Sequence, residues 1–164
     1  MDFGGMNHND LILVDIVKPY ASSMRIGDLE RLAVQTGEYS RFNVDPNFPK
    51  EKFIELYKTW IRNSVRKELA DEVLTIQQGE NIVGMVALGN KNNRGDIVLM
   101  AVDESCRRRG YGETLVKAAQ SWFVGNQYKV GQVVTQEDNI PACKLYKKCG
   151  YSIEKIEYYY HFWL

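Results

Sequence analysis

The sequence lacks an excess of charge of either sign. Its 21 lysines and arginines balance 21 aspartates and glutamates, so the formal net charge is +0 at pH 7. A protein that holds nucleic acid by neutralising phosphates needs a broad positive surface, and this balanced composition does not provide one. We therefore predict no nucleic-acid partner, even though three consecutive arginines occupy positions 107–109.

The sequence is also poor in the residues that bind metals. It contains 3 cysteines and 2 histidines, and Cys106, Cys143 and Cys149 form no CxxC pair. Structural zinc sites draw on Cys and His ligands at short spacings, so we expect no metal site. An odd set of cysteines without a secretory leader predicts free thiols in a reducing compartment, which here means the cytoplasm.

Long hydrophobic runs and linker-like segments are missing as well. The apolar run at 11–14 is far too short for a signal or membrane helix, so we predict no membrane association. Only 4 prolines occur, no proline-rich stretch divides the chain, and 164 residues fit one domain. We expect a flexible N-terminal segment at 1–10 and one domain over 11–164.

What the sequence does contain is an alternation of strand and helix patterns. A helix capped by Ser22 or Ser23 is predicted to end near Gly37, and further helices are expected at 50–69, 112–123 and 140–149. Strands are expected at 11–18, 72–77, 82–88, 96–102 and 129–136, followed by a last extended run to Leu164. This order, βααβββαβαβ, predicts an α/β (α+β) fold with a mixed sheet flanked by helices.

Two of these segments have informative hydrophobic patterns. The helix at 50–69 is strongly amphipathic, with Phe53, Tyr57 and Ile61 on one side. The strand at 96–102 is nearly all apolar, which predicts a central strand buried on both faces.

A basic, glycine-containing segment directly follows the 96–102 strand. A buried strand, a short loop and then a helix place unpaired backbone N–H groups and a positive helix terminus together, which suits a diphosphate. Glycines let a phosphate approach the backbone closely, and arginines add charge-assisted hydrogen bonds. The alternative is a solvated charge run before a helix. The residues concerned are Arg107, Arg108, Arg109, Gly110, Tyr111 and Gly112.

A second informative segment, NIPACKLYKKCGY, occupies 139–151. It reads as a short helix, because Asn139 is a favourable N-cap, Pro141 is tolerated in the first turn and Gly150 is suited to the position after the helix. By this local pattern alone, Tyr146 is a core aromatic residue.

Together the two segments resemble the GNAT superfamily of N-acetyltransferases, through its R-x-x-G-x-G and N-x-x-A-x-x-L-Y-x-x-x-G-Y/F motifs. The resemblance implies a single GNAT-type domain that binds acetyl-CoA, with the pyrophosphate on the arginine and glycine loop. It also implies that the backbone of Met100, Ala101 and Val102 pairs with the pantetheine arm. In this family Tyr146 would protonate the coenzyme sulfur, and Asn139 would help to hold the coenzyme or order its water.

The implied reaction, direct transfer of an acetyl group to a primary amine, calls for removal of a proton from the amine. Glu137, Asp138 and His161 are candidates for the base, although a solvated or structural role is the commoner one for such residues. A covalent alternative uses Cys106 or Ser105 as the nucleophile and His161 as its base.

The acceptor side of the sequence carries a weaker resemblance. The segment YSRF at 39–42, with WIRNSVR at 60–66 and VTQEDN at 134–139, is similar to the dTDP-fucosamine acetyltransferases. Those enzymes acetylate the 4-amine of a dTDP-linked 4-amino-4,6-dideoxygalactose. The resemblance implies a small-molecule amine substrate, with Tyr39 and Arg41 on the substrate side and Arg41 as a phosphate partner. An ordinary surface loop is an equally good interpretation of these two residues.

Two other functions stay open at this point. Peptide or protein acetylation is one, because the aromatic C-terminal run EYYYHFWL at 157–164 could line a peptide groove, stack on a sugar or form a homodimer interface. Burial, in the core or at a dimer interface, is the commonest fate of such a run, and we expect it here. A non-catalytic acetyl-CoA-binding module is the other, although Tyr146, Asn139, Gly110 and Gly112 are all present.

Overall fold

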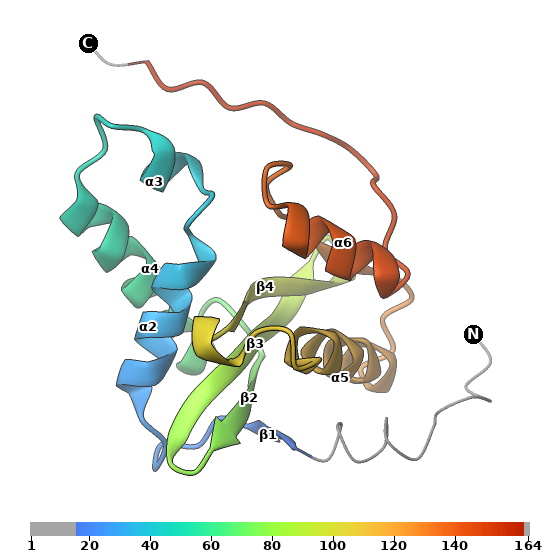
Figure 1. The fold of residues 1–164 in the computed structure, drawn as a ribbon. Helices are drawn as coiled ribbons and strands as arrows, with labels where there is room; N and C mark the ends of the chain where they lie inside the picture. The colour runs from blue at the N-terminus through green and yellow to red at the C-terminus, as the bar shows by residue number, and fades with distance from the viewer. Residues whose placement is uncertain (1–15, 163–164) are drawn as a thin grey trace.

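The computed structural model describes residues 16–162, and Figure 1 shows how the elements are arranged. The flexible segment expected at 1–10, the start of the strand expected at 11–18, and residues 163–164 lie outside the described residues. In chain order the elements are β1 (Val17–Pro19), α2 (Ile26–Thr36), α3 (Arg41–Val44), α4 (Lys50–Val65), β2 (Glu72–Gln78), β3 (Asn81–Lys91), β4 (Arg94–Val102), η1 (Glu104–Cys106), α5 (Tyr111–Gly125), β5 (Gly131–Val133) and α6 (Ile140–Lys148).

The strands form one sheet in the order β1-β2-β3-β4-β5. The first four strands are antiparallel neighbours, and β5 is parallel to β4. Asn92 and Asn93 form the two-residue turn between β3 and β4. Both have positive φ, 55° and 60°. That conformation is typical of a tight hairpin, and asparagine is one of the few residues that adopt it readily.

Helices α2 and α4 cover one face of the sheet. Leu29, Leu32 and Ala33 of α2 are fully buried at 0% exposure, and they pack with Phe53, Tyr57 and Ile61 of α4 as the amphipathic pattern predicts. Strand residues Val73, Ile82, Met85, Ala87, Leu99 and Ala101 complete this core.

Helices α5 and α6 cover the other face. The side chains of Leu115, Val116, Ala119 and Phe123 from α5 pack on alternate strand residues, and Tyr146 of α6 joins them. The mixed sheet between two helical layers confirms the predicted α/β fold class. Within residues 16–162 no helix combines the length and the apolar character needed to cross a bilayer.

Several predicted element bounds were wrong for local physical reasons. Helix α2 begins at Ile26 with Arg25 as its N-cap and no side-chain cap, so neither Ser22 nor Ser23 caps it. Helix α4 ends at Val65, ahead of the predicted 69, because Lys67 takes a left-handed conformation (φ 62°). The gap between the strands predicted at 82–88 and 96–102 shrinks to the two asparagines, because β3 and β4 extend into it from either side.

The predictions for three strands also need correction. The strand buried on both faces is β3, whereas β4 alternates between buried and half-buried residues. Strand β5 has only 3 residues, Gly131–Val133, in place of the predicted 129–136. The last predicted strand does not form, and residues 151–162 have no regular secondary structure.

Candidate active site

Strands β4 and β5 are paired along only part of their length. The parallel ladder joins Gly95, Asp96 and Ile97 to Gly131, Gln132 and Val133, but β4 continues to Val102. A register shift in the β3–β4 ladder leaves Val98 as an extra residue on β4, and such a bulge bends a strand. Within the described residues, the β4 edge beyond the bulge is therefore not covered by a neighbouring strand.

The backbone groups on this open edge can be assigned from the register. Gly84 lies opposite Val102, and the Asp103 N–H donates to the Val83 carbonyl at 2.8 Å. In an antiparallel ladder this arrangement turns the N–H and C=O of Met100 and Val102 away from β3 and those of Ala101 toward it. The backbone of Met100 and Val102 is thus available to a ligand. The predicted backbone contact of Ala101 is wrong, because that residue faces β3.

The open edge leads into the loop that precedes α5 (Figure 1). Gly110 is the N-cap of α5 with φ 80°, a left-handed conformation that glycine adopts without strain, and a Cβ added to it would meet nothing within 4 Å. The first helical hydrogen bond runs from the Thr114 N–H to the Gly110 carbonyl at 3.0 Å. The N–H groups of residues 111–113 therefore have no carbonyl of their own helix to bind, and they form a terminus suited to an anion.

The three arginines immediately precede this helix terminus in the chain, and all three are exposed. Arg107 Nε donates to the Val102 carbonyl at 3.3 Å, which holds that side chain beside the open edge. Arg108 and Arg109 form no ion pair with any residue in the described range 16–162. Arg108 itself has a positive φ of 63°. The loop thus presents uncompensated positive charge next to free N–H groups.

Gly112 has a different role from Gly110. A Cβ at position 112 would lie 3.0 Å from Leu145 Cδ2, so this glycine allows α6 to pack closely on the first turn of α5. From the sequence, both glycines were expected to let a phosphate approach the backbone. The structure adds helix packing as the reason for the second.

Residues far away in the sequence hold this loop in place. The Asp103 carboxylate accepts hydrogen bonds from Ser105 N and Oγ, at 3.0 and 2.7 Å, and forms an ion pair with Arg31 of α2. The Ser105 donors and the Arg31 guanidinium lower the pKa of Asp103 from 3.8 to about 2. At the other end of the loop, Gln78 Nε2 donates to the Tyr111 hydroxyl at 3.1 Å.

Roles for Arg31, Asp103 and Gln78 were not predicted from the sequence. They are separated from their partners by 72 residues for Arg31–Asp103 and by 33 for Gln78–Tyr111. No local spacing rule connects residues so far apart. The available signal was limited to Asp103 itself, which follows a strand and precedes Ser105 in a pattern typical of a local side-chain cap.

Helix α6 carries Asn139 and Tyr146 beside the loop. The Asn139 side chain accepts a hydrogen bond from the Ala142 N–H at 3.3 Å, which confirms the predicted N-cap. Tyr146 is 8% exposed and stacks edge-on against Tyr151, with ring centroids 5.7 Å apart. Its burial raises the pKa of the phenol well above the usual value of 10. This side chain therefore stays protonated at neutral pH.

Tyr146 also belongs to the core cluster that reaches the open edge of β4. Met100 and Val102 pack against that cluster as partly buried residues. The structure thus brings together on one side of the sheet the β4 edge, the start of α5 and the buried phenol.

The predicted substrate-side residues lie on another part of the surface, at α3. Tyr39 is half-buried and Arg41 is exposed. The Arg41 guanidinium carbon lies 4.8 Å from the centroid of the Phe42 ring and 4.3 Å from that of Tyr159 in the C-terminal segment. An arginine between two aromatic rings is held by cation–π attraction.

The C-terminal segment reaches α3 by crossing the molecule in extended form (Figure 1). His161 forms an ion pair with Asp45, just beyond α3, and lies near the Phe42 ring, with centroids 6.1 Å apart. The aromatic run is not buried in the core of this chain as expected, because Tyr158, Tyr160 and Phe162 are 72%, 91% and 86% exposed. Once strand pairing fails, an extended segment with side chains on both sides cannot bury them against one surface.

The candidates for base and nucleophile are not assembled into one unit. Glu137 and Asp138 are exposed on the loop before α6. Cys106 is 3% exposed, and its thiol lies 3.6 Å from Gln78 Oε1, whereas His161 lies at Asp45. The covalent alternative thus places its nucleophile and base in contact with different partners. Over the described part of the chain, no three His, Cys, Asp or Glu residues are grouped as metal ligands.

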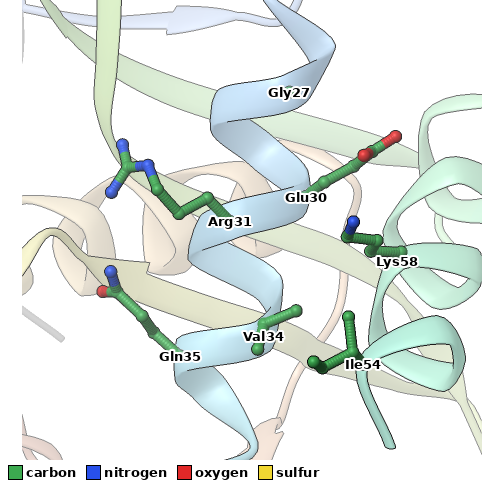
Figure 2. Close-up of a pocket in the computed structure, with 7 residues that line it drawn as sticks. All are labelled: Gly27, Glu30, Arg31, Val34, Gln35, Ile54 and Lys58. Carbon is green, nitrogen blue, oxygen red and sulfur yellow. The ribbon is translucent and has the colours of Figure 1, made fainter. Parts of the chain in front are cut away.

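A hollow of about 560 Å³ is lined by residues of α2 and α4. Figure 2 shows Arg31 and Gln35 pointing to one side of α2, while Glu30 points to the other side, where Lys58 of α4 lies. Val34 and Ile54 form an apolar patch in this hollow. Arg31 is the residue that lines the hollow and also contacts the loop before α5.

Comparison with known proteins connects this geometry to a family. The sequence profile described as "Acetyltransferase (GNAT) family" matches residues 31–151. The spore coat polysaccharide biosynthesis protein SpsD of Bacillus subtilis (strain 168) is 25% identical over 140 residues, which are 84% of this chain and 48% of that protein. Streptothricin acetyltransferase from Escherichia coli is 30% identical over 79 residues, which are 48% of this chain and 45% of that protein. The chain thus spans about half the length of these curated relatives.

Solved structures share the fold. The PaiA N-acetyltransferase from Thermoplasma acidophilum, in complex with coenzyme A, superposes with a TM-score of 0.69 at 15% identity and covers 86% of this chain and 92% of that chain. A likeness at this level of identity is evidence for the architecture alone.

Proposed function

The chain belongs to the acetyltransferase (GNAT) family, whose profile covers residues 31–151, and we propose that it is an acetyl-CoA-dependent N-acetyltransferase acting on a primary amine. One observation carries this proposal. The uncovered edge of β4 leads directly to the left-handed Gly110 cap of α5, beside exposed arginines. The uncovered edge suits an extended thioester arm, and the neighbouring helix cap with its arginines suits a diphosphate.

The open edge would hold the arm of acetyl-CoA. Met100 and Val102 each offer an N–H donor and a C=O acceptor on this side, and an extended polar chain can bind there as an added strand does. The Val102 carbonyl already accepts a hydrogen bond from Arg107. Met100 is therefore the residue with both backbone groups available, and its N–H is the donor suited to the thioester oxygen.

The loop and the start of α5 would hold the pyrophosphate. The N–H groups of residues 111–113 point out of the helix terminus, and the open space at Gly110 lets phosphate oxygens reach the backbone. Arg108 and Arg109 add positive charge from exposed positions. The residues present thus fit a diphosphate in shape and in charge.

The amine nitrogen attacks the thioester carbonyl carbon and gives up one proton to solvent as the amide forms. The carbon–sulfur bond breaks, and the departing thiolate takes a proton from a donor that solvent then reprotonates. We assign that proton to the Tyr146 hydroxyl, because burial keeps this phenol protonated at neutral pH. Asn139 contributes indirectly, since its side chain caps α6 and so fixes the helix that carries Tyr146. No bond to the enzyme forms, in agreement with the separate surroundings of Cys106 and His161.

For the acceptor we propose the amine of a nucleotide-linked amino-deoxysugar. The similarity to a polysaccharide biosynthesis protein over 84% of the chain supports this choice. So does Arg41, which is exposed, held between two aromatic rings, and forms no ion pair within residues 16–162. A guanidinium fixed in this way can form a bidentate contact with a nucleotide phosphate.

Thiol release from acetyl-CoA tests the function directly. The acceptor is dTDP-4-amino-4,6-dideoxygalactose, and a peptide with a free N-terminus is the comparison. We expect turnover with the sugar and none with the peptide. The peptide remains the second candidate because of the exposed Tyr158, Tyr160 and Phe162. Turnover of the peptide alone would reject the sugar and retain the acetyltransferase. Tight coenzyme binding with no acyl transfer to any amine would instead favour a non-catalytic binding module.

A further inference from the structure

Asp103 is the first residue beyond the open edge of β4, and its side chain organises the loop that follows. One carboxylate oxygen, Oδ1, accepts from Ser105 N at 3.0 Å and from Ser105 Oγ at 2.7 Å, which caps the short helix η1. The other oxygen, Oδ2, is paired with Arg31 Nη1. The Asp103 side chain is 14% exposed, so these partners surround most of it.

Arg31 connects this loop to the opposite layer of the fold. It projects from α2 on the side away from α4 (Figure 2), and its Nη2 lies 3.9 Å from Asp28 Oδ1. The Asp28 carboxylate in turn accepts a hydrogen bond from the Ile82 N–H at the start of β3, at 2.9 Å. A continuous polar chain thus runs from β3 through α2 to the loop before α5.

We propose that Arg31 and Asp103 are positioning residues, whose ion pair holds loop 103–110 in the conformation that receives the coenzyme pyrophosphate. This inference rests on the proposed function. Neither side chain needs to touch the coenzyme, because the pair acts on the backbone that supplies the N–H groups. If the loop samples other conformations, the apparent dissociation constant rises in inverse proportion to the competent fraction.

The exposure of Arg31 allows a positioning role in coenzyme binding to be distinguished from a role in global stability. The Arg31 side chain is 46% exposed, and ion pairs at that level of exposure contribute little to global stability. Loss of Arg31 should therefore weaken coenzyme binding without a matching loss of thermal stability. Asp103→Asn also removes the charge that the Ser105 donors stabilise, so this variant should lower both affinity and stability. If Arg31 only supported the fold, Arg31→Ala would likewise change both.

The test is calorimetric titration of the full chain with coenzyme A. We expect Arg31→Ala and Asp103→Asn each to weaken binding about five- to tenfold, which corresponds to roughly 1 kcal/mol. Asn at position 103 can still accept from Ser105, so that variant removes the charge and keeps the cap. Arg31→Lys, which keeps the charge, should recover most of the affinity. At saturating acetyl-CoA, kcat should stay unchanged.

Arg25→Ala is the matched control. Arg25 precedes α2 and forms an ion pair with Glu80 at 2.8 Å, and among the described residues neither side chain forms a hydrogen bond or ion pair with loop 103–110. This variant should lower the melting temperature about as much as Arg31→Ala does and leave coenzyme affinity within about twofold of the unaltered chain.

A double-mutant cycle gives the sharpest outcome. If the ion pair carries the effect, the Arg31→Ala, Asp103→Asn double variant should bind coenzyme A no more weakly than either single variant. Fully additive losses, or unaltered affinity in both single variants, would overturn the positioning role while leaving the proposed function in place. Failure of the unaltered chain to bind coenzyme A would overturn the proposed function and this inference together.

Discussion

Gly110→Ala tests whether the left-handed cap of α5 forms the anion site. Gly110 has φ 80° and open space around its Cβ position, so alanine meets no steric contact and the whole perturbation is conformational. A left-handed L-residue costs about 1–2 kcal/mol. The loss of flexibility in the unfolded chain offsets about 0.4–1 kcal/mol of that cost.

The expected effects on stability and on binding differ in size. A net loss of about 1 kcal/mol lowers the melting temperature of a chain this long by only about 2–4 °C. Coenzyme binding should suffer more, because the strain is relieved when the backbone at 110 rotates and turns the N–H groups of residues 111–113 away. Loss of one hydrogen bond to a charged phosphate costs about 1.5–3 kcal/mol, which weakens coenzyme affinity about ten- to a hundredfold.

Two further variants make the result decisive. Gly79→Ala is matched, because Gly79 also has positive φ (60°) and an unobstructed Cβ position, but it lies in the β2–β3 turn. It should cost similar stability and leave affinity unchanged. Gly110→Asn should bind nearly normally, since asparagine tolerates the left-handed region. Calorimetry with coenzyme A gives the affinities. Equal affinities for Gly110→Ala and Gly79→Ala would refute the anion site at the start of α5.

Three functional variants and one pH experiment complete the predictions. Gly112→Asp should abolish coenzyme binding in calorimetry, because it places a carboxylate beside the phosphates and forces Leu145, 3.0 Å from the added Cβ, to move; normal binding would reject the loop assignment. Tyr146→Phe should lower kcat with little change in coenzyme affinity, and an unaltered rate would remove the phenol from the mechanism. Arg41→Ala should raise KM for a nucleotide sugar more than for its unphosphorylated analogue, and equal increases would exclude the phosphate contact. Asp103 has its pKa lowered from 3.8 to about 2, so it stabilises the fold at neutral pH and this contribution is lost as the pH falls from about 4 to 2. Urea unfolding of Asp103→Asn should therefore show lower stability at pH 7 and a shallower loss on acidification, and parallel curves would contradict that contribution.

Much of the fold follows from patterns local to each element. The side chains Phe53, Tyr57 and Ile61 repeat at helical spacing, and they form the buried side of α4. The last strand was mispredicted because strand formation depends on a partner. Residues 151–162 have the aromatic composition of a strand, but no described strand accepts them.

In the site, too, the features fixed by local sequence were predictable and those that depend on distant partners were not. Gly110 and Asn139 have roles defined by backbone conformation at one helix end, and the sequence indicated both. Ala101 was misassigned because the direction of a strand's backbone groups depends on ladder register, which no single strand encodes. Arg31 and Gln78 reach the loop across the fold, so only the tertiary structure reveals them.

The most direct measurement of the central claim is a titration of the ¹⁵N-labelled chain with coenzyme A, followed through its backbone amide resonances. We predict that the largest shifts occur at Gly110, Tyr111 and Gly112, with a second group at Met100 and Val102 on the open edge of β4. Saturable binding that leaves these amides unmoved and shifts those of α2 and α4 around the hollow would contradict the proposed site.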